Sequence, residues 1–105
     1  MNPSRSDRRP VRAPRIWIRK ARGETLAYNP GTGGAHLLNE TALAIWDLCD
    51  GETSAAEMVE AICQLCSMHP DVVEEDVDRI LREFEDAGLV VWVPDALGRR
   101  RGTGA

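Results

Sequence analysis

The chain has 105 residues, of which 43% are apolar and 29% are charged, and its formal net charge is −4. This length suits one domain with a modest hydrophobic core and leaves no room for a separate catalytic domain. No apolar run approaches the ~18 residues of a membrane span, and the first residues lack the apolar region of a secretory signal. We therefore expect a cytoplasmic protein with no membrane segment.

Charge is distributed unevenly along the chain. Residues 1–23 hold eight Lys or Arg and one Asp, residues 24–95 hold two Arg and sixteen acids, and residues 96–105 hold three Arg. Residues 1–14 and 95–105 contain too little apolar sequence to pack, so we expect flexible basic tails there. Such tails can attract an anionic partner, but a solvated tail that aids solubility is the simpler interpretation.

Short strands are expected at the start of the domain between the tails, which spans residues 15–94. Arg22 and Gly23 are suited to a tight turn, and the Gly-rich residues 29–34 form a second turn. These glycines lack the spacing of a phosphate-binding loop. The three predicted strands cover residues 15–20, 24–28 and 35–38.

The first helix is expected between Asn39 and Gly51, because both are capping residues. The side-chain oxygen of Asn39 can accept from N–H groups of the first turn, and Gly51 can adopt the left-handed backbone that ends many helices. Apolar residues at helical spacing predict its buried stripe, which contains Leu38, Ala42, Ile45, Trp46 and Cys49.

The second helix is expected to start at a capping box formed by Ser54 and Glu57. It should end near Met68, because Pro70 disfavours a helical conformation in the residue before it. Its apolar face is predicted to contain Ala55, Val59, Ile62 and Cys66.

The third helix has the clearest amphipathic pattern. Asp71 is expected to cap it and Ala87 and Gly88 to end it, and residues 89–93 then form a short strand or extended segment. Its apolar stripe contains Val73, Val77, Ile80, Leu81 and Phe84. Together the elements predict an α+β fold like a winged helix-turn-helix, with a three-stranded antiparallel sheet followed by three helices.

Cys63 and Cys66 form a CxxC motif that is followed by His69, so a metal or redox site has to be considered. The motif falls within a helix and no second CxxC completes four ligands, although Cys49 could join if its helix packs alongside. Buried thiols acting as small apolar residues are the simpler interpretation. We expect no metal, no cofactor and no disulfide. His36 and His69 have no partner at a catalytic spacing, so we expect no enzyme activity.

The order of these motifs resembles the PqqD family, also described as the recognition element for precursors of ribosomally synthesised, modified peptides. The matching motifs are Leu38-Asn39, Thr41-Ala42, Ile45, Leu48, Asp50-Gly51, Thr53-Ser54 and Gly88-Leu89. The resemblance implies a non-catalytic peptide chaperone that binds the leader of a precursor peptide by β-strand addition. It also implies that the chaperone presents the leader to a modifying enzyme, such as a radical SAM protein or another maturase.

The resemblance also implies a binding site, because the family's leader adds beside the third strand and rests against the third helix. Asp76 and Glu83 lie one position off the apolar stripe, where they would meet basic groups of the leader. An alternative role for Val77, Ile80 and Phe84 is that they are core residues only. The implied peptide-binding residues are Ala35, His36, Leu37, Leu38, Val73, Asp76, Val77, Ile80, Glu83 and Phe84.

A second functional class is a winged-helix DNA-binding or protein-interaction regulator. DNA binding requires Lys and Arg on the last helix, where this chain has only Arg79 and Arg82. The acids of that helix are Glu74, Glu75, Asp76, Asp78, Glu83, Glu85 and Asp86. Because this surface would repel a duplex, we expect no nucleic-acid partner.

Trp17 alternates with Ile16 and Ile18, so its strand pattern allows it to face either the core or solvent. We expect it to be buried. An exposed Trp17 would indicate a contact with the modifying enzyme or with a second protomer, and we expect a monomer or weak dimer.

Overall fold

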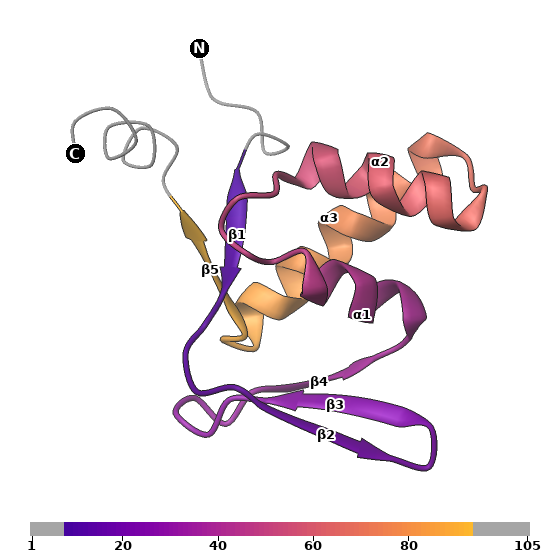
Figure 1. The fold of residues 1–105 in the computed structure, drawn as a ribbon. Coiled ribbons are helices and arrows are strands. Elements are labelled where there is room, and N and C mark those ends of the chain that lie inside the picture. The colour runs from indigo at the N-terminus through magenta and orange to yellow at the C-terminus, as the bar shows by residue number, and fades with distance from the viewer. Residues whose placement is uncertain (1–7, 94–105) are drawn as a thin grey trace, which may run out of the picture.

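The computed structural model describes residues 8–93, and Figure 1 shows their arrangement. A three-stranded sheet lies on one side of three helices, and a separate two-stranded sheet lies beside the helices. The predicted α+β fold, with three strands followed by three helices, is confirmed. The elements are β1 (Arg9–Arg12), β2 (Trp17–Ala21), β3 (Glu24–Tyr28), β4 (Ala35–Leu38), α1 (Glu40–Asp47), α2 (Ala55–Cys66), α3 (Pro70–Asp86) and β5 (Val90–Val93).

The larger sheet has the strand order β2-β3-β4, and all neighbours are antiparallel. Arg22 and Gly23 both have positive φ, at 55° and 80°, as expected for the two-residue turn that best matches the twist of a hairpin. Strands β3 and β4 have the predicted bounds. Strand β2 starts at Trp17 rather than at residue 15, because Arg15 has a left-handed φ of 64° that interrupts the extended chain.

The smaller sheet corrects the prediction of a flexible tail over residues 1–14. Arg9–Arg12 form β1, which pairs antiparallel with β5. Pro10 is fully buried, and the N–H of Arg12 donates to the carbonyl of Cys49 at 3.0 Å. Local composition could not predict this strand, because its partner lies at the other end of the domain. Residues 1–7 and the predicted tail over 95–105 lie outside the described residues.

Arginine side chains also attach this end of the chain to the rest of the domain. The Arg8 guanidinium lies 4.3 Å from the centroid of the Trp92 ring, within cation–π distance. Arg12 donates to the carbonyl oxygens of Trp46 at 2.9 Å and of Asp47 at 3.2 Å, at the C-terminal end of α1. The Trp46 carbonyl also accepts from the N–H of Cys49 at 3.1 Å, so Arg12 adds to the capping of α1 while β1 pairs with β5.

The predicted starts of α1 and α2 are confirmed. The Asn39 side chain accepts from the N–H of Ala42 at 2.8 Å, and the capping box of Ser54 and Glu57 is complete. Helix α2 ends at Cys66, slightly before Met68, because Ser67 adopts a left-handed conformation. Helix α3 starts at Pro70, so the prediction that Asp71 caps it is wrong.

His69 caps α3 instead. Its side chain accepts from the N–H of Asp71 at 3.2 Å. Pro70 occupies the first turn, where proline costs no helical hydrogen bond because backbone N–H groups there have no partner within the helix.

Gly51 does not end α1 as predicted. With a φ of 81° it carries the chain across β1, and its N–H donates to the carbonyl of Pro10 at 2.9 Å. Asp50 shapes the same loop by accepting from the N–H groups of Glu52 and Thr53. Partial burial acts to raise the pKa of Asp50, but these hydrogen bonds outweigh it and hold the pKa below its ordinary value.

The core lies between the three helices and the face of the larger sheet that points toward them. The stripes predicted for α1 and α3 are confirmed, since every member is buried. The face predicted for α2 is partly wrong: Met58 is buried, whereas Val59 is half-buried and Cys66 is exposed. Among the described helices, none is long and apolar enough to cross a membrane.

Candidate functional site

Strand β4 has an open edge. It pairs with β3 on one side, and no other described strand pairs with it. The N–H of Asn29 donates to the carbonyl of Gly34 at 2.9 Å, so the carbonyl of Gly34 points toward β3. Because this direction alternates along an antiparallel strand, His36 also bonds toward β3, whereas the N–H and C=O groups of Ala35 and Leu37 point to the open edge.

The loop before β4 fixes the strand to the end of α3. Asn29 donates to the carbonyl of Gly88 at 2.7 Å, and the Thr32 hydroxyl donates to the carbonyl of Ala87 at 3.2 Å. A Cβ on Gly34 would lie 2.0 Å from that same Ala87 oxygen, so only glycine fits this contact. The start of β4 and the end of α3 are therefore held together.

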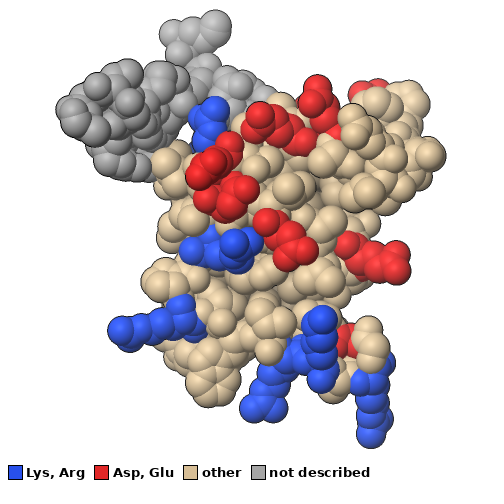
Figure 2. Space-filling view, viewed as in Figure 1, with Lys and Arg blue, Asp and Glu red and all other residues tan. Residues whose placement is uncertain are grey.

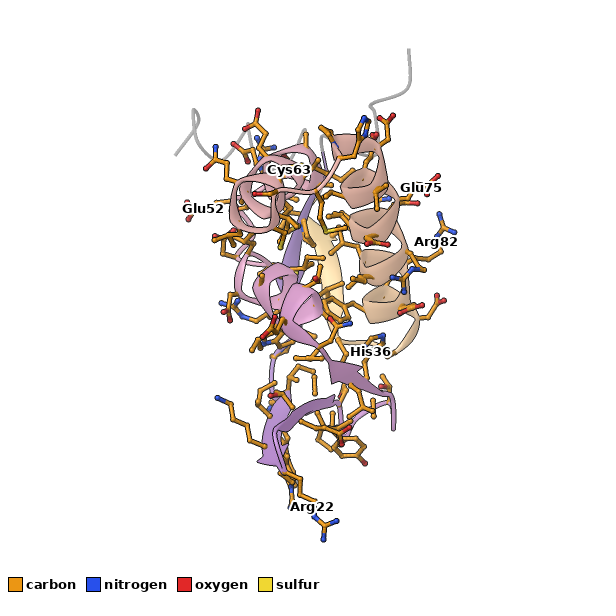
Figure 3. The ribbon with its side chains drawn as sticks, turned by 90° about the vertical axis from the view of Figure 1, so that its right-hand side faces the viewer. Arg22, His36, Glu52, Cys63, Glu75 and Arg82 are labelled. Carbon is orange, nitrogen blue, oxygen red and sulfur yellow. The ribbon has the colours of Figure 1, made fainter. Side chains whose placement is uncertain are left out.

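His36 connects β4 to α3 just beyond this contact, and Figure 3 shows it between the two elements. Its Nε2 lies 2.7 Å from Oε1 of Glu83, and its Nδ1 lies 2.7 Å from the carbonyl oxygen of Leu37. Both partners are acceptors, so only a doubly protonated imidazolium donates to both. The ring also packs edge-on against Phe84, with centroids 5.3 Å apart. His36 thus orients an open-edge carbonyl of β4.

Glu83 belongs to a charged row along α3. Arg79 lies 3.4 Å from carboxylate oxygens of both Asp76 and Glu83. The hydrogen bond from His36 is the largest effect and lowers the pKa of Glu83 below its ordinary value. Burial opposes it, and the charges of His36 and Arg79 each add a smaller lowering effect. The two acids predicted to meet a basic peptide are therefore already shared with one arginine of the same helix.

The apolar residues predicted to line a groove on α3 are buried core residues. Val73, Val77, Ile80 and Phe84 are each at most 3% exposed. This burial agrees with the alternative that the stripe belongs to the core, and the role of the stripe in peptide binding stays a prediction.

The surface of α3 beside this stripe is more exposed. It consists of residues at helical spacing, which we call the α3 rim: Val72, Asp76, Arg79 and Glu83. Asp76 and Glu83 were predicted as site residues, whereas Arg79 and the exposed Val72 were not. Their spacing, one step around the helix from the apolar stripe, was the signal in the sequence that could have identified them.

Comparisons with known proteins identify the family and the fold of this chain. The sequence profile of the PqqD family, described as coenzyme PQQ synthesis protein D, matches residues 24–90. The chain belongs to the PqqD family. Its fold is similar to that of a solved structure described as TbiB1 in complex with the TbiA(beta) leader peptide. The TM-score is 0.66 at 24% identity, covering 81% of this chain and 99% of that chain. No curated protein sequence matches significantly.

The thiols of this PqqD-family domain differ in environment. Burial raises the pKa of Cys49 to about 12, and its Sγ donates to the carbonyl of Ile45. Cys63 is half-buried and Cys66 is exposed. Within residues 8–93 no group of three His, Cys, Asp or Glu side chains is placed to hold a metal ion. The PqqD family is one of non-catalytic binding domains, in agreement with the expectation that this chain is not an enzyme.

Proposed function

We propose that this PqqD-family domain binds the leader of a ribosomally synthesised precursor peptide as an extra strand on β4 and presents it to a modifying enzyme. The observation that carries the proposal is the row of open-edge N–H and C=O groups on Ala35 and Leu37, which lies beside the α3 rim. The similar fold of TbiB1, solved in complex with a leader peptide, supports a peptide as the partner of this domain.

Strand addition explains how one domain can bind an extended peptide. The four main-chain groups of Ala35 and Leu37 give hydrogen bonds worth roughly 0.5–1.5 kcal/mol each, whatever the peptide sequence. Alternate side chains of the peptide then face the α3 rim, where Val72 offers an apolar contact. Arg79 and His36 already pair with Asp76 and Glu83, so the rim favours a peptide with an apolar residue on that side.

His36 prepares the edge for this interaction. Its Nδ1 holds the carbonyl of Leu37 in position before a peptide arrives. A peptide N–H that donates to the same carbonyl either shares its two lone pairs with His36 or replaces the imidazole. Because Glu83 holds the other ring nitrogen, the imidazole stays oriented in both cases. We therefore assign His36 a positioning role and Leu37 the direct main-chain contact.

The test replaces the N–H of Leu37 and leaves the fold intact. Leu37→Pro removes a donor at the open edge, where proline is tolerated because no strand pairs there. Leu37→Ala is the matched control, since it removes the same side chain and keeps the N–H. The probes are synthetic peptides covering the N-terminal halves of short precursors encoded beside this gene, titrated into the ¹⁵N-labelled full chain.

We expect amide shifts along β4 and the α3 rim, and at least tenfold weaker binding for Leu37→Pro than for Leu37→Ala. Equal affinity of both variants contradicts strand addition at this edge. Binding of duplex DNA by the same full chain, with no response to any of these peptides, replaces the proposal with the regulator function.

A further inference from the structure

One face of the larger sheet points away from all three helices, and no described element covers it (Figure 1). The opposite face carries the buried residues Thr25, Ala27 and Leu38. Side-chain alternation and strand register assign the remaining positions to the uncovered face. We call these residues the outer face: Trp17, Arg19, Ala21, Glu24, Leu26, Tyr28, Ala35 and Leu37.

The outer face carries a continuous apolar patch. Trp17 is 53% exposed and Leu37 is 57% exposed, so the expectation that Trp17 is buried is wrong. Trp17 stands opposite Tyr28, with ring centroids 6.3 Å apart, and Leu26 stands opposite Leu37. Large apolar side chains that are neighbours on the surface of a small domain mark a protein-interaction site, and tryptophan is the most frequent anchor of such sites.

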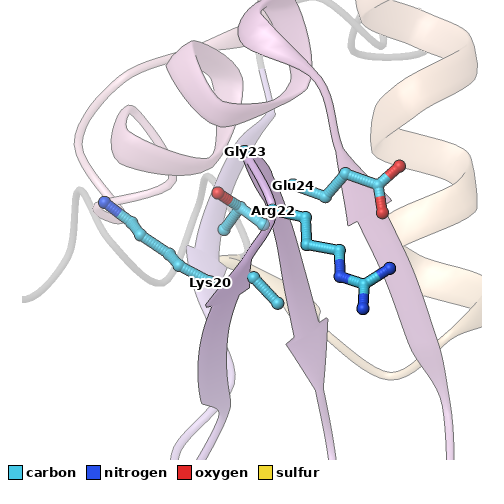
Figure 4. A pocket seen from close by; sticks show the side chains of 6 residues that line it. Lys20, Arg22, Gly23 and Glu24 are labelled. Atoms are coloured by element: carbon cyan, nitrogen blue, oxygen red, sulfur yellow. The ribbon is translucent and has the colours of Figure 1, made fainter.

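The border of the patch carries more positive than negative charge. Arg19 lies on the outer face, and Lys20, Arg22 and the single acid Glu24 lie at the end of the hairpin. Within residues 8–93 no ion pair includes any of the three basic residues. An open hollow of about 380 Å³ lies at the turn. Figure 4 shows Lys20, Arg22 and Glu24 beside it. Figure 2 shows the charges separated, with basic residues toward the sheet and acidic residues over the helices. The complementary partner surface is therefore apolar with an acidic border.

Leu37 belongs to the outer face and to the peptide edge at once. Its main chain points to the open edge, whereas its side chain lies on the outer face. A peptide strand added beside β4 continues the same pleat. Every second side chain of that peptide then lies next to Ala35 and Leu37 on the outer face, and the others face the α3 rim.

We propose that the outer face is the docking surface for the enzyme that modifies the bound peptide, and that outward side chains of the peptide form part of this surface. The enzyme contributes an apolar patch with an acidic border. This inference rests on the proposed function. Since an occupied edge enlarges the surface that the enzyme contacts, peptide and enzyme bind the domain with positive coupling, and each tightens the other by the same factor.

The test measures binding of the purified peptide-modifying enzyme encoded beside this gene to the full chain, with and without the precursor peptide defined above. Trp17→Ser removes the apolar anchor and Arg19→Glu reverses a border charge. Val91→Ser on β5 is the matched control, because Val91 is also 52% exposed and lies on the other sheet. Peptide affinity is measured in parallel for each variant.

We expect Trp17→Ser and Arg19→Glu to weaken enzyme binding at least tenfold, Val91→Ser to change it less than twofold, and all three to keep peptide affinity within twofold. The added peptide should tighten enzyme binding to the wild-type chain. Enzyme affinity that is unchanged in Trp17→Ser, or absent for the wild-type chain, overturns the inference.

Two other outcomes would overturn the inference by assigning the outer face to a different partner. A Trp17-dependent dimer in sedimentation, without enzyme binding, assigns the outer face to a second copy of this chain. Binding of a duplex DNA that Arg19→Glu abolishes, again without enzyme binding, assigns it to nucleic acid. Failure of the proposed function gives a different result, because the peptide then does not bind. If enzyme binding still depends on Trp17 in that case, the outer face remains assigned as the docking surface for the enzyme.

Discussion

The two faces of the β2-β3-β4 sheet differ in what stabilises them and in what they leave available. On the inner face, Ala27 and Leu38 are buried and His36 packs on Phe84 of α3. On the outer face, Trp17 and Leu37 are more than half exposed. The same three strands thus serve the core on one side and present apolar surface on the other.

This difference shows how a small domain divides its residues between stability and binding. A chain of about 100 residues buries one core, and that core needs only one face of the sheet. An apolar residue that remains on the other face adds little to folding and favours association, so its presence indicates binding. Strand β4 contributes to both stability and binding, because its open edge borders both faces.

The largest expected effect on stability comes from comparing two aromatic rings: Phe84 of α3, which packs against the inner face, and Trp17 on the outer face. Phe84→Ala should lower the free energy of unfolding by about 3–5 kcal/mol, since Phe84 is fully buried between His36 and Trp46. Trp17→Ala removes a larger ring, but its cost should stay within about 0.5 kcal/mol, as for other surface sites. Urea denaturation followed by circular dichroism measures both values. Similar losses for the two variants would remove the distinction between the faces.

The second test concerns the contact that joins β4 to α3. Gly34→Ala should destabilise the fold by about 3 kcal/mol, because the new Cβ would lie 2.0 Å from the carbonyl oxygen of Ala87, a backbone atom that cannot move away alone. Gly33→Ala is the matched control in the same loop. Its Cβ meets no atom within 4 Å, so only its left-handed φ of 80° costs about 1 kcal/mol.

The same denaturation experiment compares the two glycine variants. Equal losses would mean that backbone conformation, and not the contact with α3, determines the role of this loop. A larger loss for Gly34→Ala, accompanied by weaker peptide binding in the folded fraction, would show that the contact also positions the edge.

The sequence predicted most elements because their signals are local. The cap at Asn39, the capping box at Ser54 and the stripe on α3 each depend on residues within a few turns of one another. Strand β1 was not predictable in this way, since Arg9–Arg12 have no apolar alternation and depend on pairing with β5. The cap of α3 was misassigned because His69 is a rarer cap than Asp71.

The candidate site was predictable to a similar extent. The family motifs identified β4 and α3, and spacing placed Glu83 beside the stripe. The sequence could not show that His36 meets Glu83, because that contact depends on how β4 crosses α3. It also could not show which side of the Phe84 stripe stays open. Which side stays open depends on packing across the whole domain, and the periodicity of one helix carries no information about that packing.

The smallest expected effect tests the ion pair of His36 and Glu83, which joins the inner face to α3. The hydrogen bond from His36 lowers the pKa of Glu83, so the carboxylate contributes stability above its ordinary pKa of about 4.3 and loses it as the pH falls through the lower folded value. Glu83→Gln keeps an acceptor for His36 without the charge. Since the Glu83 side chain is 42% exposed, we expect a cost of about 0.5 kcal/mol at pH 6 that decreases as the pH falls below the ordinary pKa of a glutamate.

Urea denaturation across this pH range measures the difference, with Glu85→Gln as the control on an exposed position of the same helix. The control should show no pH-dependent difference from the wild-type chain. A Glu83→Gln cost that stays constant with pH would mean that the carboxylate charge is unimportant to this contact. In that case β4 would be fixed to α3 by packing of His36 on Phe84 and by the neutral hydrogen bonds of Asn29 and Thr32, with no contribution from the charge of Glu83 beside the peptide edge.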